Sequence, residues 1–197
     1  MKKLILASIS IALLYACAPP ADSNQEPAPQ EIGYQISKKG EKIPLYGGDM
    51  AAVSIVESYI KAHNDRDLET IKSLNAAEGF LIHGPNAEVI KGTEAQIELL
   101  TAWFEENNPV WKTKYLISNT YTDAKGKQQL WVTSGHDLTQ TVDGKQVVVN
   151  QMHDALIVDG KITYFSVNER VPAPEEVAAE EAEEAEEEQA QELPLVV

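Results

Sequence analysis

The sequence predicts an α+β domain in which one strongly curved antiparallel sheet wraps around three N-terminal helices. Two observations lead to this class. Apolar residues recur at helical spacing in the first part of the domain, whereas from Trp111 onward long β-rich segments alternate with turn signals. Helices followed by an antiparallel meander are typical of α+β folds.

Three segments carry apolar residues at helical spacing, namely Val53–Ile60, Leu68–Leu74 and Ile97–Phe104. Asp49 is the expected cap of the first helix, because its side chain can accept a free backbone N–H. Thr93-Glu94-Ala95-Gln96 matches a capping box, which predicts that the third helix begins there.

Turn-forming residues mark where the predicted strands begin and end. Phe80-Leu81-Ile82 is expected to be a short strand that ends at Gly84-Pro85-Asn86. Asp143-Gly144 and Asp159-Gly160 are strong signals for tight hairpins. The four long strands predicted around these turns are Trp111–Thr122, Gln128–Val142, Gln146–Val158 and Lys161–Val171.

Composition excludes several classes of protein. The chain has 197 residues, with 16 basic against 31 acidic side chains and a net charge of −15. Such a chain repels phosphate backbones, so no nucleic-acid partner is expected. A single cysteine excludes an internal disulfide framework and a cysteine-based zinc site.

The N-terminal sequence predicts targeting to the bacterial cell envelope. Residues 1–16 combine a basic start with an apolar run that is too short to span a bilayer. The run ends at Cys17, which resembles the lipobox cysteine that is diacylated and becomes the mature N-terminus. Ala18 is not the aspartate that retains such proteins in the inner membrane, so an outer-membrane anchor is expected by analogy. The alternative is an ordinary signal peptide with a chance cysteine.

The remaining segments differ in composition. Residues 17–43 are rich in proline and polar residues, which predicts a flexible tether. Residues 44–172 form the expected domain. Residues 173–197 form an acidic tail of glutamate and alanine, expected to be a lone solvated helix because its carboxylates repel and no lysine offsets them.

Four motifs in this order resemble the nuclear-transport-factor-2-like superfamily, which includes SnoaL-like polyketide cyclases and ketosteroid isomerase. They are Ser58-Tyr59-Ile60, the helix start at 67–71, Lys91-Gly92-Thr93 and the hairpin at 158–162. The resemblance covers the whole domain. It implies a cone-shaped sheet enclosing a pocket, and a homodimer through the outer sheet face. It does not imply an activity, because this fold hosts enzymes, binders and assembly modules.

The resemblance also implies candidate catalytic positions. Counting from the family motifs places the tyrosine of the isomerases at Tyr59, the general base at His83 and the hydrogen-bonding acid at His153. Histidine therefore replaces the carboxylate base, which argues against steroid isomerisation. His63, near the end of the first helix, is expected to be exposed.

Strand alternation adds residues that would contact a ligand. If His153 points inward, His136 and the odd-numbered residues of the last strand point inward too. A bulge would reverse this register and turn Asp154 inward instead. Trp103 is assigned to the pocket, with core or rim as its alternative. The expected ligand-contacting residues are His136, Asp154, Phe165, Val167, Glu169 and Trp103.

Three functions follow from these features. The first is a lipoprotein that binds a small, largely apolar organic molecule. The second is a SnoaL-like isomerase, cyclase or lyase, in which His83 acts as general base while Tyr59 and His153 stabilise an enolate. The third is a non-catalytic interaction module. No cofactor or metal is expected; three imidazoles and a carboxylate could suit a divalent metal, but they come from separate strands.

We predict that the mature protein begins at a lipidated Cys17. Cys17→Ser, or globomycin treatment, should leave uncleaved precursor and abolish labelling by a fatty-acid analogue. Normal processing of Cys17→Ser, together with an unlabelled wild-type protein, would contradict the prediction.

Overall fold

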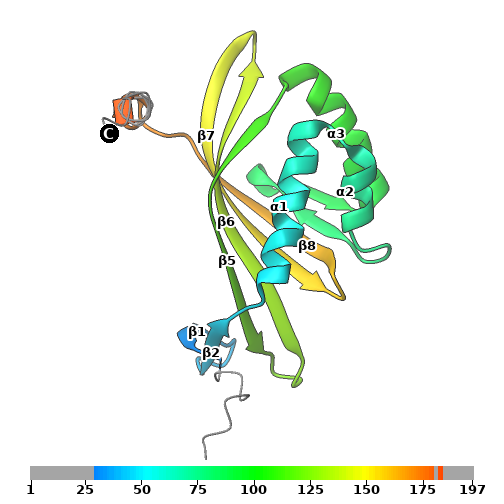
Figure 1. Cartoon of the computed structure of the whole chain (residues 1–197), viewed down its shortest axis with the longest axis vertical. Coiled ribbons are helices and arrows are strands. Elements are labelled where there is room, and N and C mark those ends of the chain that lie inside the picture. Colours follow the sequence, from blue (N-terminus) through cyan, green and yellow to red (C-terminus); the bar gives the residue numbers. More distant parts are fainter. Residues whose placement is uncertain (1–28, 180–181, 184–197) are drawn as a thin grey trace, which may run out of the picture.

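The computed structural model describes residues 29–179 and 182–183, and shows a curved eight-stranded sheet with helices packed on one face (Figure 1). The strand order is β1-β2-β5-β6-β7-β8-β3-β4. The predicted signal peptide, Cys17, the first part of the tether and the end of the tail lie outside the described residues. The predicted α+β class, a curved sheet around three helices, is confirmed.

Two helices begin at aspartate caps. Asp49 accepts a backbone N–H from the first turn of α1 (Met50–Asp65), as predicted, and Asp67 does the same for α2 (Leu68–Leu74). Between them Arg66 adopts the left-handed conformation, with φ of 62°, which ends α1 and turns the chain. Within the described ranges, no helix combines the length and the apolar character that a membrane span requires.

The third helix, α3 (Thr93–Asn107), begins where predicted, but the predicted capping box is wrong. Its N-cap residue is Gly92, and no side chain within the described ranges caps the helix. The side chain of Gln96 is buried and forms hydrogen bonds with Tyr59 and Asn75. Gln96 therefore forms hydrogen bonds inside the core instead of taking part in a capping box at the start of α3.

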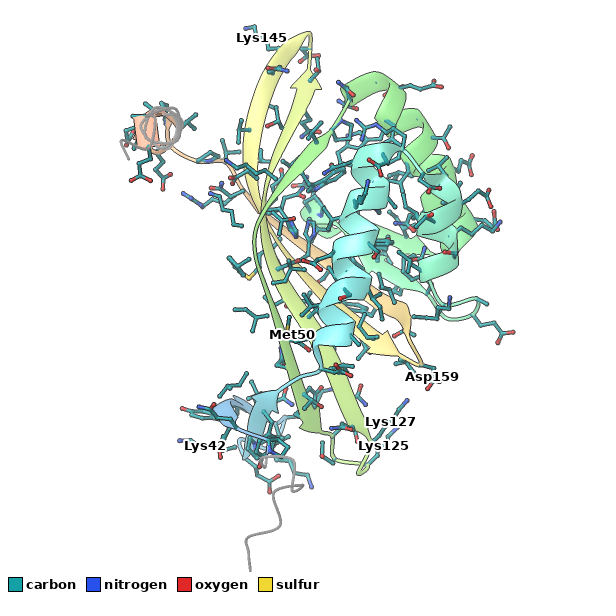
Figure 2. All side chains as sticks on the ribbon, viewed as in Figure 1. Lys42, Met50, Lys125, Lys127, Lys145 and Asp159 are labelled. Carbon is teal, nitrogen blue, oxygen red and sulfur yellow. The ribbon has the colours of Figure 1, made fainter. Side chains whose placement is uncertain are left out.

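Four long strands form the body of the sheet: β5 (Val110–Thr122), β6 (Gln128–Val142), β7 (Lys145–Val158) and β8 (Lys161–Arg170). Asp143-Gly144 and Asp159-Gly160 have positive φ at both positions, which tight hairpin turns require. The hairpin prediction is therefore confirmed. Lys125 and Lys127 lie at one end of these strands and Lys145 at the other (Figure 2).

The sheet is mixed, whereas the meander alone led us to expect antiparallel pairing throughout. The short strand β3 (Leu81–His83) pairs in parallel with β8 and antiparallel with β4 (Val89–Lys91). A short 3₁₀ helix, η1 (Pro85–Ala87), joins β3 to β4. The long connection through α3 and the meander returns the chain beside β3, which allows the parallel pair.

The tether prediction is wrong for residues 31–43. They belong to a hairpin of β1 (Glu31–Ile36) and β2 (Lys42–Gly47), which extends the sheet beyond β5. The Ser37 hydroxyl oxygen accepts two backbone N–H groups and closes the turn of this hairpin. The domain thus begins near residue 31.

Part of the acidic tail is helical. Residues 174–179 form a helix that stands apart from those covering the sheet (Figure 1). The Arg170 guanidinium pairs with the Glu176 carboxylate at 2.8 Å, and both side chains are exposed. An exposed pair of this kind adds little stability.

The core lies between the helices and the concave face of the sheet. Val56 and Ile71 from the helices pack in one cluster with Val132, Leu138 and Ile162 from the strands, and all five side chains are fully buried. The inward residues of β6 are even-numbered and those of β7 odd-numbered, so the concave face has a fixed set of side chains.

We predict that Gly48→Ala destabilises the protein by about 1–3 kcal/mol, because an added Cβ would overpack a tight contact. That Cβ would lie 2.8 Å from the backbone nitrogen of Asn119 and 2.9 Å from the carbonyl carbon of Ser118. Gly47→Ala is the matched control, since nothing lies within 4 Å of its Cβ position. Urea unfolding measures both variants; equal stability would contradict the prediction.

Candidate functional site

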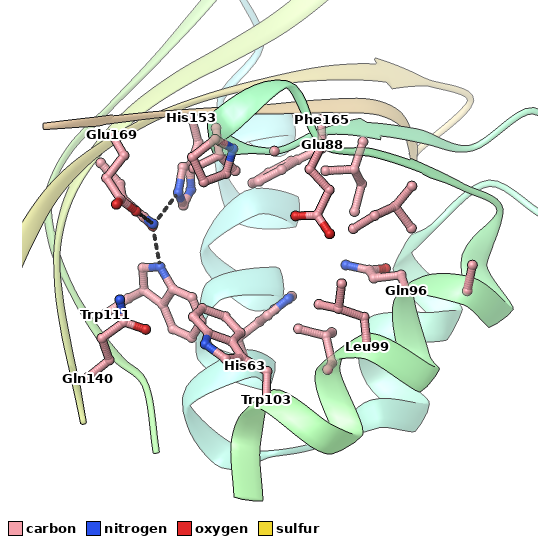
Figure 3. Close-up of a pocket in the computed structure, with 18 of the residues that line it drawn as sticks. His63, Glu88, Gln96, Leu99, Trp103, Trp111, Gln140, His153, Phe165 and Glu169 are labelled. Atoms are coloured by element: carbon pink, nitrogen blue, oxygen red, sulfur yellow. Dashed lines mark hydrogen bonds between the residues drawn. The ribbon is translucent and has the colours of Figure 1, made fainter. Parts of the chain in front are cut away.

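A cavity of about 760 Å³ lies between the helices and the concave face of the sheet (Figure 3). Residues from α1, α3, the long strands and the segment 82–90 line it. Most of its lining surface is apolar, with a few convergent polar side chains. This size and character are typical of sites for small molecules.

Six of the residues predicted from the sequence line this cavity: Tyr59, Trp103, His153, Phe165, Val167 and Glu169. They come from two helices and two strands, and they reach the cavity for the reason expected. The odd-numbered residues of β7 face the helices because of strand alternation. On β8 the inward residue near the turn is Ile162, and a bulge before Tyr164 turns Phe165, Val167 and Glu169 inward.

His136 also faces inward but does not line the cavity. It is almost fully buried, and its ring centroid lies 4.6 Å from that of His153. The hydroxyls of Ser134 and Thr113 lie within hydrogen-bond distance of its two ring nitrogens. His136 therefore supports His153, and its predicted ligand contact is wrong.

The prediction that His83 faces the cavity is also wrong. Ile82 points inward beside Phe165, so the next residue must point to the opposite face of the sheet. There His83 is exposed, and its Nδ1 lies 3.0 Å from the hydroxyl of Tyr164. His83 and His153 are on opposite faces of the sheet and share no site.

Asp154 likewise faces away from the cavity, as the predicted alternation requires when His153 points inward. The Thr133 hydroxyl donates to its carboxylate at 2.6 Å. The pairing of β7 with β6 runs without a bulge past this residue, so the register is not reversed. The predicted ligand contact of Asp154 is wrong.

Sequence reasoning missed His63, which was expected to be exposed. It is buried, it lines the cavity, and its Nδ1 donates to the backbone carbonyl of Tyr59 at 2.7 Å. Its ring contacts those of Tyr59 and Trp111 edge-on. The available signal was its spacing, since residues four apart lie on one face of a helix.

A second missed residue, Gln151, connects the polar groups at one end of the cavity. Its side-chain oxygen accepts from the indole N–H of Trp111 at 2.8 Å and from His153 Nε2 at 3.0 Å. Its amide donates to the Glu169 carboxylate at 2.9 Å. The available signal was its position two residues before His153 on the same strand.

These bonds determine the proton position on His153. Indole nitrogen only donates and ionised carboxylate only accepts, which fixes the orientation of the Gln151 amide. His153 must then carry its proton on Nε2. Its Nδ1 keeps a free lone pair, and this buried atom has no hydrogen-bond partner among the described residues.

A separate polar chain reaches the cavity through Tyr59. Asn75 donates to the side-chain oxygen of Gln96 at 2.7 Å, and the Gln96 amide donates to the Tyr59 hydroxyl. All three side chains are buried. Burial raises the pKa of the Tyr59 hydroxyl well above its usual range, so it remains protonated at neutral pH.

The buried histidines are neutral at pH 7. Burial lowers the pKa of His63 to about 4 and that of His136 to about 4. It also holds the pKa of His153 well below its usual range, with smaller contributions from the other two imidazoles. Among the described residues, no group of three or more His, Cys, Asp or Glu side chains is placed to hold a metal ion.

We predict that stability falls as the pH is lowered from 6.5 to 5. The unfolded histidines bind protons below about pH 6.5, whereas the folded ones do so only near pH 4 or lower. Each buried histidine should lower the free energy of unfolding by about 1.4 kcal/mol per pH unit between pH 6.5 and 5. Full stability should return above pH 6.5. Urea unfolding of wild type and His136→Asn should show a shallower slope in the variant; a flat wild-type profile would contradict this.

Searches for similar proteins found no matching family model and no matching curated protein. Solved structures do resemble this chain. An epoxide hydrolase from M. tuberculosis, described as LEH-like, is 16% identical with a TM-score of 0.50, covering 62% of this chain and 84% of its own. Bal32a, from a soil-derived mobile gene cassette, is 18% identical with a TM-score of 0.51, covering 60% and 88%.

A SnoaL-like polyketide cyclase described from Jannaschia sp. CCS1 is 15% identical, with a TM-score of 0.50 over 61% of this chain and 86% of its own. Identities this low relate the folds alone. The described domain therefore has the nuclear-transport-factor-2-like fold of SnoaL-like proteins, as its sequence motifs predict.

Proposed function

We propose that this chain is a lipoprotein of the bacterial cell envelope, and that its domain binds a small, largely apolar organic molecule. The observation that supports binding most directly is the cavity of about 760 Å³, which the protein's own side chains leave unfilled. Its apolar walls would hold the body of the molecule, and the polar groups around Gln151 would orient it.

The anchor follows from Cys17. Residues 18–30 separate this cysteine from β1, and an extended chain of that length spans at most about 45 Å. A lipidated Cys17 would therefore keep the cavity close to the outer membrane.

Catalysis is the second candidate, since two of the structural neighbours are described as an epoxide hydrolase and a polyketide cyclase. His83 cannot serve as the base, because it lies on the outer face. His153, with its free Nδ1, is the base that such an enzyme would use. The lowered pKa makes His153 a weak base at neutral pH, which favours binding.

Nucleophilic catalysis has less support. Among the described residues that line the cavity, none is a serine, threonine, cysteine or lysine, so a hydroxyl, thiol or amine nucleophile has no candidate there. The interaction module remains a third candidate, supported by exposed apolar side chains on the outer face at Tyr115, Ile117 and Met152. A homodimer would bury these residues, but it would not explain why the cavity is unfilled.

We predict that residues 18–197, which retain the whole domain, bind the neutral apolar dye N-phenyl-1-naphthylamine with 1:1 stoichiometry. Leu99→Trp should lower the affinity at least tenfold, because Leu99 lines the cavity and an indole would fill it. Ile97→Trp is the matched control, since this residue on the same helix is also half-buried but does not line the cavity. Dye fluorescence measures both; no binding, or equal loss in the two folded variants, would contradict the proposal.

A further inference from the structure

The charged side chains lining the cavity have one sign. They are Glu88, Glu98, Glu106 and Glu169, and no lysine or arginine of the part of the chain that the structure describes joins them in the lining. The histidines in the lining, His63 and His153, are neutral through burial and do not offset this charge. The net charge of the lining is therefore negative, which favours cations over anions.

These carboxylates are not neutralised by neighbours, because none of them forms an ion pair with another described residue. Two nearby arginines are engaged elsewhere. Arg66 stacks on the ring of Phe104 and donates to Asn108, while Arg170 pairs with Glu176.

A hydrogen bond fixes the position of the Glu169 carboxylate. Gln151 donates to one of its carboxylate oxygens, and Trp111 and His153 hold Gln151 in place. Figure 3 shows the Glu88 carboxylate pointing into the cavity from the side opposite Glu169. A ligand in the cavity would thus lie between two carboxylates.

Aromatic rings line the same space. Trp103 and Trp111 meet edge to face, with ring centroids 5.4 Å apart, and both line the cavity. Indole faces attract organic cations through their quadrupole. Buried His153, whose Nδ1 has no hydrogen-bond partner among the described residues, is a further unused polar group in this lining.

We propose that the ligand is an amphiphilic organic cation, with a protonated amine held by Glu169 beside the tryptophans and an apolar body along the rest of the cavity, while Glu88 adds to the negative charge of the lining. This rests on the proposed function. The same charges would repel a carboxylate-bearing lipid of equal size, so free fatty acids are the wrong class of ligand.

Decylamine, decanol and decanoate test this proposal, because they share one chain length and differ in charge. Decylamine is protonated at pH 7, as a lysine side chain is. Calorimetric titration of residues 18–197, below the aggregation concentration of each probe, should give the amine at least fivefold tighter binding than the alcohol, and the carboxylate the weakest. Raising the salt concentration should reduce this preference.

The variant Glu88→Gln/Glu169→Gln should bring the ratio of amine to alcohol affinity close to one. Glu88→Gln alone, which leaves the Gln151 contact intact, should lower the ratio in part. Glu105→Gln is the matched control, since it removes an exposed carboxylate from α3 outside the cavity and should keep the wild-type ratio.

The outcomes separate the two proposals. Equal affinities for amine and alcohol, tighter binding of decanoate, or a ratio unchanged in the double variant would overturn the cationic ligand while the binding cavity stands. Failure of all three probes and of the neutral dye to bind would overturn both.

Discussion

The cavity depends on the register of β7 between β6 and β8. In this register Gln151 and His153 face the helices, and Asp154 faces solvent beside Thr133. A slip of one residue would place the Asp154 carboxylate under the helices and remove both polar groups from the cavity. The Asp-Gly turns at each end of β7 set the pairing, so two short turns determine which side chains a ligand meets.

Local signals explain why much of this site could be predicted. The inward residue His153 lies a few positions from turns that the sequence marks clearly, and the pairing of β6 with β7 has no bulge, so counting along β7 is short and reliable. On β8 a bulge before Tyr164 reverses the face, so Phe165 and Val167 cannot be placed by counting from the turn alone. His83 has no such reference. Its strand pairs in parallel with β8, about 80 positions away in the chain, and no turn links the two strands. An error of one residue in the predicted register of β3 placed His83, instead of Ile82, toward the cavity.

Other errors arose where a distant partner replaced a local one. Gln96 matches a capping position, yet the buried hydroxyl of Tyr59 and the amide of Asn75 would both lose a partner without it. Leaving such groups unpaired costs more than losing an exposed cap. The sequence predicts a tether for residues 31–43 of this hairpin because its pairing with β5, through only two residues of β2, cannot be inferred from composition.

Gln151 links the Glu169 carboxylate to His153. The indole N–H of Trp111 can only donate, so it fixes the orientation of the Gln151 amide, and the same orientation keeps the proton of His153 on Nε2. A cation beside Glu169 would pair with a carboxylate that the Gln151 amide already holds in place. Ligand charge, the Gln151 orientation and the free lone pair of His153 are therefore properties of one hydrogen-bonded network. A ligand with a cation at Glu169 and a hydrogen-bond donor toward His153 would satisfy both ends of this network.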